Sequence, residues 1–179
     1  HTANEQMGMS RHRFIEIIST ASFLHDIGKV GIEDKILNKP TQLTNEEFSL
    51  IKTHTLIGYQ TLDVVNQQNP DNQFIQMGLQ IVRSHHERWD GSGYPDGLNG
   101  KEIPLAARVM AVVDVYDAIR SQRPYKGPMP HEAAVKEIVN ASGNHFDPMV
   151  VLAFLAKENE IEALSEEFHS EAPKLPWRF

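Results

Sequence analysis

Apolar side chains recur every three to four residues along most of the chain, which is the spacing of one face of an α-helix. The pattern predicts helices over residues 10–26, from 44 to about 65, from about 70 to 84, from 104 to about 122, over 131–141 and from 148 onward. No alternating pattern typical of a strand extends beyond a few residues. The sequence therefore predicts an all-α helical bundle in one domain.

Polar residues at the predicted helix starts support these boundaries. Ser10 is suited to cap the first helix, and Thr44 with Glu47 forms the capping-box pattern of the second. Asp147 followed by Pro148 is typical of an N-cap and a first helical position. Residues 29–43 and 89–103 are expected to be loops, and the second of these contains four glycines and one proline.

The bulk composition fits an ordinary globular domain. The chain has 179 residues, of which 40% are hydrophobic, and no apolar run approaches the roughly 20 residues needed to span a bilayer. The absence of cysteine excludes disulfides and thiolate metal sites and fits a reducing compartment, so we expect a cytoplasmic protein. The chain begins with His1 rather than Met, which indicates a fragment of a longer protein.

Negative charge is concentrated near the C-terminus. The formal net charge is −7, and residues 157–171 alone contain six Glu and one Lys. The rest of the chain is close to neutral and lacks the basic face that extended nucleic-acid binding needs. A small anionic nucleotide needs only a few local cations and a metal, so the charge pattern is compatible with such a ligand.

Histidine and aspartate recur roughly thirty residues apart, on four successive predicted helices. The candidate metal ligands are His25, Asp26, His54, His85, His86 and Asp114. Helical bundles build metal sites from inward-facing side chains of several helices. Imidazole and carboxylate ligands without thiolate suit iron, manganese or another first-row divalent ion such as nickel.

The number of candidate ligands indicates more than one ion. Six protein ligands are too many for one catalytic ion with open positions, and they fit two ions that share a carboxylate. Asp26, which adjoins His25, is the natural bridge. Lys29 is expected on the same helix face as His25, where it can bind a phosphate or protonate a leaving oxygen. The set predicts a metal-dependent phosphohydrolase.

Each of these residues taken alone has an ordinary structural explanation. A single His-Asp pair is more often a capped helix end, and His54 alone is more often a core or surface polar residue. Asp114 is different because it lies among apolar neighbours, where a buried carboxylate is costly without a metal or a cation. The joint occurrence of all six residues is what favours a metal site.

Several ordered motifs resemble those of the HD-GYP family, a branch of the HD-domain metal phosphohydrolases. The HD motif of that family is similar to residues 24–31, which begin Leu24-His25-Asp26. The GYP motif is similar to residues 85–98, which contain Gly93-Tyr94-Pro95. Later blocks of the family resemble residues 114–118, 123–126 and 143–148, so the resemblance covers about residues 8–155.

The resemblance implies an HD-domain helical bundle with a GYP loop between core helices, and hydrolysis of cyclic di-GMP to linear pGpG or onward to GMP. It implies two or three divalent ions, with iron as the first choice and manganese or nickel as alternatives. The six residues named above would be the metal ligands, and Lys29 and Asp26 would be the catalytic residues. The residues that would bind or frame the substrate are Gly93, Tyr94, Pro95, Asp117, Arg123 and Lys126.

The chain departs from the family pattern in two places. Glu33 and Thr41 stand where the family usually has Pro and Gly, so the conformation of the loop after the HD motif stays open. The first helix of the family normally carries a His upstream of the HD pair, and this chain begins too late to contain it. We therefore expect a C-terminal fragment of a longer protein, one that lacks that helix and any upstream sensory region.

Two other functions stay open from the sequence. The chain can be a catalytically idle module that binds a nucleotide, or a partner such as a GGDEF diguanylate cyclase, through the GYP loop. It can also be an HD hydrolase that acts on another cyclic dinucleotide. The presence of Lys29 together with every candidate ligand favours the enzyme over the idle module.

Overall fold

The computed structural model describes residues 8–121 and 127–171, and the regular elements in these ranges are helices. The α-helices in chain order are α2 (Arg11–Ala21), α3 (Asp34–Leu37), α4 (Asn45–Lys52), α5 (His54–Gln68), α6 (Gln73–Ser84), α7 (Leu105–Arg120), α8 (His131–Asn140), α9 (Pro148–Leu155) and α10 (Glu158–Glu171). Three short 3-10 helices are η1 (Ser22–Leu24), η2 (Ile27–Gly31) and η3 (Gly100–Glu102). The all-α fold expected from the sequence is therefore confirmed.

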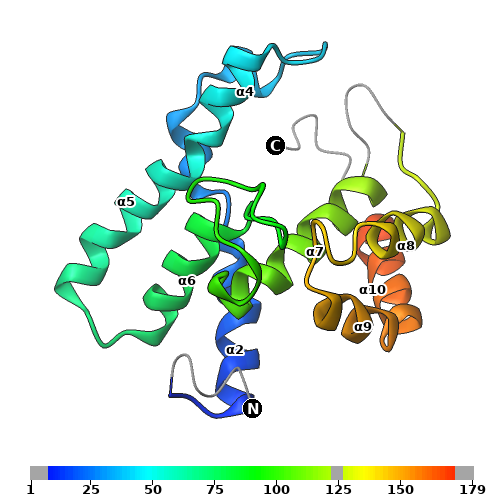
Figure 1. Cartoon of the computed structure of the whole chain (residues 1–179). Helices are drawn as coiled ribbons and strands as arrows, with labels where there is room; N and C mark the ends of the chain where they lie inside the picture. The colour runs from blue at the N-terminus through cyan, green and yellow to red at the C-terminus, as the bar shows by residue number, and fades with distance from the viewer. Residues whose placement is uncertain (1–7, 122–126, 172–179) are drawn as a thin grey trace.

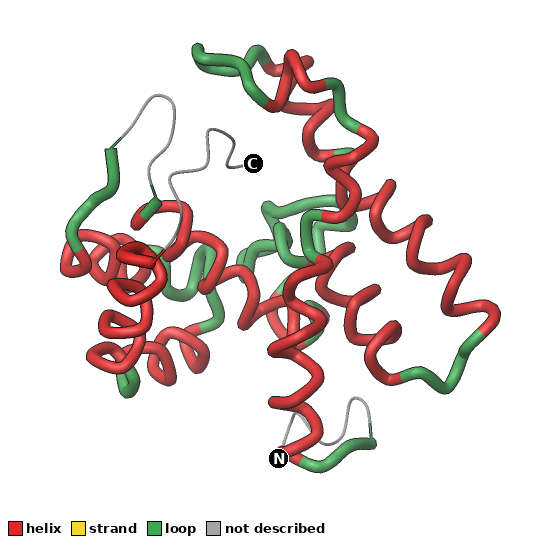
Figure 2. The backbone as a smooth tube through the Cα atoms, turned by 180° about the vertical axis from the view of Figure 1, so that it is seen from behind, coloured by secondary structure: helices red, strands yellow, loops and turns green. Residues whose placement is uncertain are grey.

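The helices form two groups that share α7 (Figures 1 and 2). In the first group α6 packs against α2 and α5, and η2 packs against α5. In the second group α8 and α9 pack against the other end of α7. Within the described ranges, no helix is long and apolar enough to cross a membrane.

Helix α7 contributes to two of the three hydrophobic core clusters found among the described residues. Its first half places Ala106 and Met110 in a core with residues of α2 and α6, such as Ile17 and Ile81. Its second half places Tyr116 in a second core, whose other buried residues include Ala134, Ile138, Phe146 and Phe154. Burial of apolar surface on two sides of one helix ties the two groups together.

The predicted helix starts are confirmed by their caps. The Ser10 side chain accepts a hydrogen bond from the Arg13 backbone N–H, and Thr44 and Glu47 form both bonds of a capping box. The Asp147 carboxylate accepts a hydrogen bond from the Met149 backbone N–H at the start of α9. These side chains satisfy N–H groups that have no partner within the helix.

Two of the predicted helices differ from expectation, one in length and one in continuity. The helix expected over residues 10–26 ends at Ala21, and the one expected from 44 to about 65 is divided at Thr53 into α4 and α5. Hydroxyl groups bond to backbone carbonyls at both places: Ser22 Oγ donates to the Ser19 carbonyl, and Thr53 Oγ1 to the Leu50 carbonyl at 2.6 Å. The same kind of bond also occurs within a continuous helix, as from Thr61 Oγ1 to the Ile57 carbonyl in α5, so these bonds alone do not explain the breaks. In addition, the expected loop over residues 29–43 contains α3.

A close backbone contact holds the turn after the HD pair against α5. A Cβ built on Gly28 would lie 2.5 Å from the Gly58 backbone nitrogen and would also collide with the His54 carbonyl. A Cβ built on Gly58 would lie 2.6 Å from a Val82 side-chain carbon. Only glycine allows the chain to approach this closely, and the contact brings the HD turn next to the first residue of α5.

Candidate metal centre

The six candidate ligands lie at helix ends or on α7 and face a common centre. His25 and Asp26 occupy the junction between η1 and η2, and His54 is the first residue of α5. His85 caps the C-terminal end of α6, and His86 follows it. Asp114 lies in the second half of α7. The structure thus brings together residues that are far apart in the sequence.

The distances between these side chains are those of a compact cluster. The His54 Nε2 atom lies 3.5 Å from His85 Nε2 and 3.5 Å from Asp26 Oδ1. The His25 Nε2 atom lies 3.1 Å from Asp26 Oδ2 and 4.0 Å from Asp114 Oδ1. One ligand atom from each of His54, His85 and His86 lies within 4.8 Å of the others, so these three imidazoles can hold a metal ion.

Backbone carbonyls at the helix ends orient three of the imidazoles. The Nδ1 atom of His25 lies 2.7 Å from the Ser22 carbonyl, and that of His54 lies 2.7 Å from the Ile51 carbonyl. His85 Nδ1 lies 2.9 Å from the Ile81 carbonyl. Donation of the Nδ1 proton to a carbonyl leaves the Nε2 lone pair facing the centre, which is how metal-binding histidines are usually held. The donor set therefore fits a metal site.

Electrostatics keep most of these imidazoles neutral. Burial, together with the neighbouring imidazoles, lowers the pKa of His85 to about 4 and that of His86 to about 2. Burial also lowers the pKa of His54. A neutral imidazole is the form that binds a metal, so these three side chains need not lose a proton at neutral pH to act as ligands.

Asp26 is the most strongly stabilised carboxylate of the cluster. Burial alone would raise its pKa, but hydrogen bonds and charge interactions with His25 and Lys29 hold this pKa far below its usual range. Burial likewise opposes protonation of His25, yet contact with Asp26 raises the pKa of His25. Asp26 is therefore ionised, as a carboxylate shared between cations must be.

Lys29 points back to the HD pair from η2. Its Nζ atom lies 2.6 Å from Asp26 Oδ2, and its side chain is 29% exposed. The sequence prediction placed Lys29 on one α-helical face with His25, whereas the chain forms a 3-10 helix here and Lys29 pairs with Asp26, three residues earlier. The ammonium group nevertheless lies at the rim of the cluster.

The GYP loop is attached to the centre through a buried glutamate that the sequence analysis did not identify. Glu87 is 2% exposed, and its carboxylate accepts hydrogen bonds from the backbone N–H groups of Asp96, Gly97 and Leu98. The signal was available in the sequence: a glutamate directly before a loop rich in Gly and Pro faces many N–H groups that no helix satisfies. Glu87 fixes the shape of this loop.

The GYP residues lie beside the histidines. A Cβ on Gly93 would lie 2.5 Å from Glu87 Cα, so a larger residue does not fit there. The Tyr94 ring stacks on the His86 ring, with centroids 4.8 Å apart and an angle of 27° between the ring planes. Burial raises the pKa of Tyr94, with smaller contributions from the charges of Asp114 and Asp26. Pro95 follows Tyr94 and is partly buried.

Other predicted site residues differ from expectation or lie outside the described ranges. The Asp114 side chain is 29% exposed, so it is not the buried carboxylate expected from its apolar neighbours; α7 turns it toward the cluster instead. Asp117 is exposed. Its carboxylate accepts a hydrogen bond from the Ser121 hydroxyl, which is not part of the cluster. Arg123 and Lys126 lie outside the described residues.

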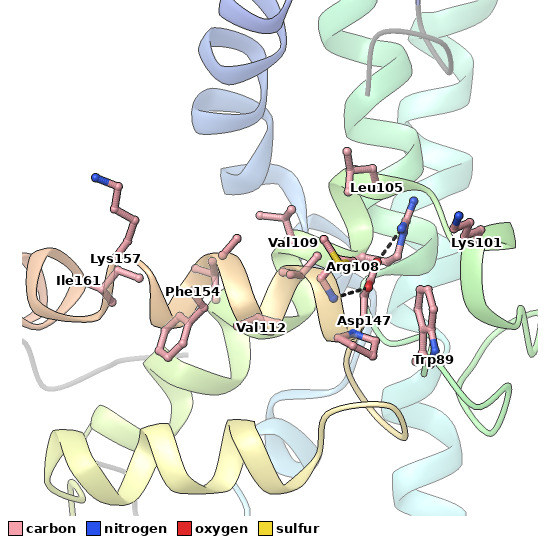
Figure 3. Close-up of a pocket in the computed structure, with 15 residues that line it drawn as sticks. Trp89, Lys101, Leu105, Arg108, Val109, Val112, Asp147, Phe154, Lys157 and Ile161 are labelled. Atoms are coloured by element: carbon pink, nitrogen blue, oxygen red, sulfur yellow. Dashed lines mark hydrogen bonds and ion pairs between the residues drawn. The ribbon is translucent and has the colours of Figure 1, made fainter. Parts of the chain in front are cut away.

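A hollow of about 800 Å³ lies between α7 and α9 (Figure 3). Its walls are mostly apolar and include Val109, Val112 and Phe154, and Trp89 and Lys101 lie toward one end, with Lys157 and Ile161 toward the other. Arg108 crosses this region and pairs with Asp147 at 2.6 Å. The groove contains none of the six candidate ligands.

Comparison with known proteins identifies the family of this all-α chain. The family model of the HD domain matches residues 5–150, so the chain belongs to the HD-domain family. Its motifs and relatives assign it to the HD-GYP branch of that family. HD-domain proteins of this kind depend on metal, and the histidine cluster described here can bind one.

Two relatives are named cyclic di-GMP phosphodiesterases. One, from Thermotoga maritima, is 50% identical over 157 residues, which are 88% of this chain and 41% of the relative. The other, from Vibrio cholerae, is 46% identical over 159 residues, which are 89% of this chain and 32% of the relative. The chain thus spans well under half the length of these relatives.

One solved structure shares the fold. It is described as a cyclic GMP-AMP specific phosphodiesterase from V. cholerae, and it aligns with a TM-score of 0.57 at 20% sequence identity. The alignment covers 96% of this chain and 46% of the other. At this level of identity the likeness concerns the fold alone.

Proposed function

We propose that this chain is a metal-dependent phosphodiesterase domain that hydrolyses cyclic di-GMP to pGpG, GMP or both. The observation that carries the proposal is the set of imidazole Nε2 atoms and carboxylates that face one centre beside the GYP loop. The names of the two relatives support the choice of substrate.

The metal ligands in this proposal are His25, Asp26, His54, His85, His86 and Asp114. They fit two first-row divalent ions or three, with iron as the first choice and manganese or nickel as alternatives. When bound, the ions would supply the Lewis acidity that phosphoryl transfer needs. Asp26 is suited to lie between two ions because its two oxygens face different imidazoles, Oδ2 toward His25 and Oδ1 toward His54.

The remaining roles belong to residues around the ligands. Lys29 would place its ammonium group by the leaving oxygen and donate a proton to it. Gly93, Tyr94 and Pro95 would form the wall of the substrate pocket, since Tyr94 stacks directly on His86. The motifs further assign Asp117 to the surroundings of the pocket, and Arg123 and Lys126 to substrate phosphates.

Three further statements belong to the same proposal. The chain would be one domain of a longer protein, and a GGDEF diguanylate cyclase would be a candidate partner. The cytoplasmic location expected from the absence of cysteine stays a prediction.

The test is a metal analysis combined with product analysis on cyclic di-GMP and on mixed cyclic dinucleotides. We expect at least two first-row ions per chain and release of pGpG or GMP. Asp26→Asn should lose both metal and activity, whereas His12→Ala, at an exposed histidine of α2, should keep both. Hydrolysis of a mixed cyclic dinucleotide alone would contradict the choice of substrate. Absence of hydrolysis by the metal-loaded protein would contradict the proposal that the chain is an enzyme.

A further inference from the structure

Lys52, the last residue of α4, lies against two aromatic rings near the metal centre. Its Nζ atom is 4.8 Å from the centroid of the Phe48 ring and 5.2 Å from that of Tyr94. The two rings meet edge to face at 6.4 Å. Ring faces attract an ammonium group at such distances, so the rings hold the cation in place.

The partners of Lys52 distinguish it from other lysines of the described chain. Four of these have a carboxylate oxygen 2.5 to 2.7 Å from Nζ: Lys29, Lys35, Lys39 and Lys157. No ion pair among the described residues involves Lys52, although it is only partly exposed. Its charge is thus held by rings rather than neutralised, and it can attract an anion from outside.

Tyr94 connects this lysine to the metal centre. One ring contact joins Tyr94 to His86, and another joins it to Lys52. The Tyr94 hydroxyl also lies close enough to Asp114 and Asp26 for their charges to raise its pKa, after the larger effect of burial. Lys52 therefore lies one aromatic ring away from the site where a phosphodiester would be cleaved.

We propose that Lys52 binds the phosphate of the substrate that is not being cleaved. This inference rests on the proposed function, because a cyclic dinucleotide contains two phosphodiesters and only one can occupy the metal centre at a time. Lys29 is close to the metal ligands, whereas Lys52 is displaced from them by the width of Tyr94.

The geometry also explains why rings hold this cation. A carboxylate partner would cancel the charge, and a freely moving lysine would lose side-chain entropy on binding. Two ring contacts restrict the ammonium group and leave its N–H groups able to donate to phosphate oxygens. Lys52 is a substrate-binding residue in this view, and Phe48 is a positioning residue that acts through it.

The test compares two substrates in the metal-loaded protein. Cyclic di-GMP has a second phosphodiester, whereas bis(p-nitrophenyl) phosphate has one. We expect Lys52→Met to raise KM for cyclic di-GMP by roughly ten-fold, with little change in kcat and in metal content. The loss of kcat/KM on bis(p-nitrophenyl) phosphate should be at least five times smaller than the loss on cyclic di-GMP.

Three further variants separate charge, position and fold. Lys52→Arg should recover most of the affinity because it keeps the cation, and Phe48→Leu should raise KM by a smaller factor. Lys39→Met is the matched control. It removes a loop lysine that pairs with Glu47, a residue of α4 like Lys52, and it should leave KM unchanged. An equal loss on both substrates in Lys52→Met, or no loss on cyclic di-GMP, would overturn the inference.

Failure of the proposed function gives a different result. If the wild-type protein binds cyclic di-GMP without hydrolysing it, the proposed activity is wrong, and calorimetric Kd values for wild type and Lys52→Met then test Lys52 alone. A Kd that Lys52→Met raises roughly ten-fold supports the inference, and an equal Kd contradicts it. If no cyclic dinucleotide binds, both proposals are wrong.

Discussion

The metal centre and the apolar groove, both beside α7, differ in which parts of the helices form them. The metal centre is built mainly from helix ends: His25, His54 and His85 each lie at a helix boundary and bond to a carbonyl of the preceding turn. The groove in Figure 3 is lined largely by apolar side chains of α7 and α9, such as Val109 and Phe154. Each of these carbonyls also accepts a backbone N–H bond, and its second lone pair can orient an imidazole.

The contrast concerns the side chains that each region presents. The walls of the groove supply shape and apolar surface, whereas the metal centre presents imidazoles, three of which are oriented by carbonyls at helix ends. The following changes test this difference, from the largest expected effect to the smallest.

Removal of one oriented ligand should have the largest effect. His85→Ala should lower kcat/KM by more than roughly 100-fold, because loss of a ligand should exceed the cost of losing an outer partner of a ligand. Bound metal should fall in parallel, as measured by elemental analysis, while circular dichroism retains the helical signal. Met149→Ala, at a 70% exposed residue of the groove, is the control and should change neither quantity. Full metal retention in His85→Ala would remove it from the ligand set.

Lys29→Met should slow the reaction without removing the metal. A general acid typically contributes roughly 10²-fold or more to kcat, and Lys29 is the cation that contacts Asp26. Steady-state kinetics and elemental analysis of the same preparation would test this expectation. Near-normal kcat would show that the ammonium group serves only the ion pair with Asp26.

Loss of the Glu87 carboxylate should destabilise the GYP loop. Glu87→Ala leaves three backbone N–H groups without their acceptor, and hydrogen bonds to a charged group contribute about 1.5–3 kcal/mol to stability. We expect denaturant unfolding to report a loss of roughly this size together with a raised KM. Glu87→Gln, which keeps one acceptor oxygen and the shape of the side chain, should lose less. Equal losses in both variants would mean that the negative charge, which both remove, holds the loop.

The metal-free protein should become less stable in mild acid. Burial lowers the pKa of His85 to about 4, whereas an unfolded histidine has a pKa of about 6.5. Between these values the unfolded chain binds more protons than the folded one, so the free energy of unfolding decreases as the pH falls from 6.5 toward 4. Thermal melts of chelated protein at pH 7.5 and pH 5 should differ by several degrees, and His85→Gln should reduce that difference. If the difference in Tm between the two pH values is the same in wild type and His85→Gln, His85 is not a buried neutral imidazole in the folded protein.

The sequence predicted the parts of this structure that depend on local signals. Helix caps at Ser10, Thr44 and Asp147 need only neighbouring residues, and all three are present. The six candidate ligands were also identified by residue type and spacing, and the structure brings them together. Their roles as ligands stay predictions.

Features that depend on distant contacts were missed or placed incorrectly. The helix breaks at Ala21 and Thr53 lie on either side of the HD turn, whose packing on α5 no local pattern reveals. Glu87 acts on backbone groups nine to eleven residues away, and its role depends on the folded loop. The exposure of Asp114 depends on which face α7 turns to the other helices.

The contact between Gly28 and Gly58 has a consequence for the spacing of the candidate ligands. At this contact the two backbones touch with no side chain between them. The contact therefore sets how far the HD turn lies from His54. A methyl group at Gly28 would act as a spacer between the HD turn and α5 and would change the distance from His25 and Asp26 to His54. The spacing of the candidate ligands thus depends on residues that bear no donor atoms of their own.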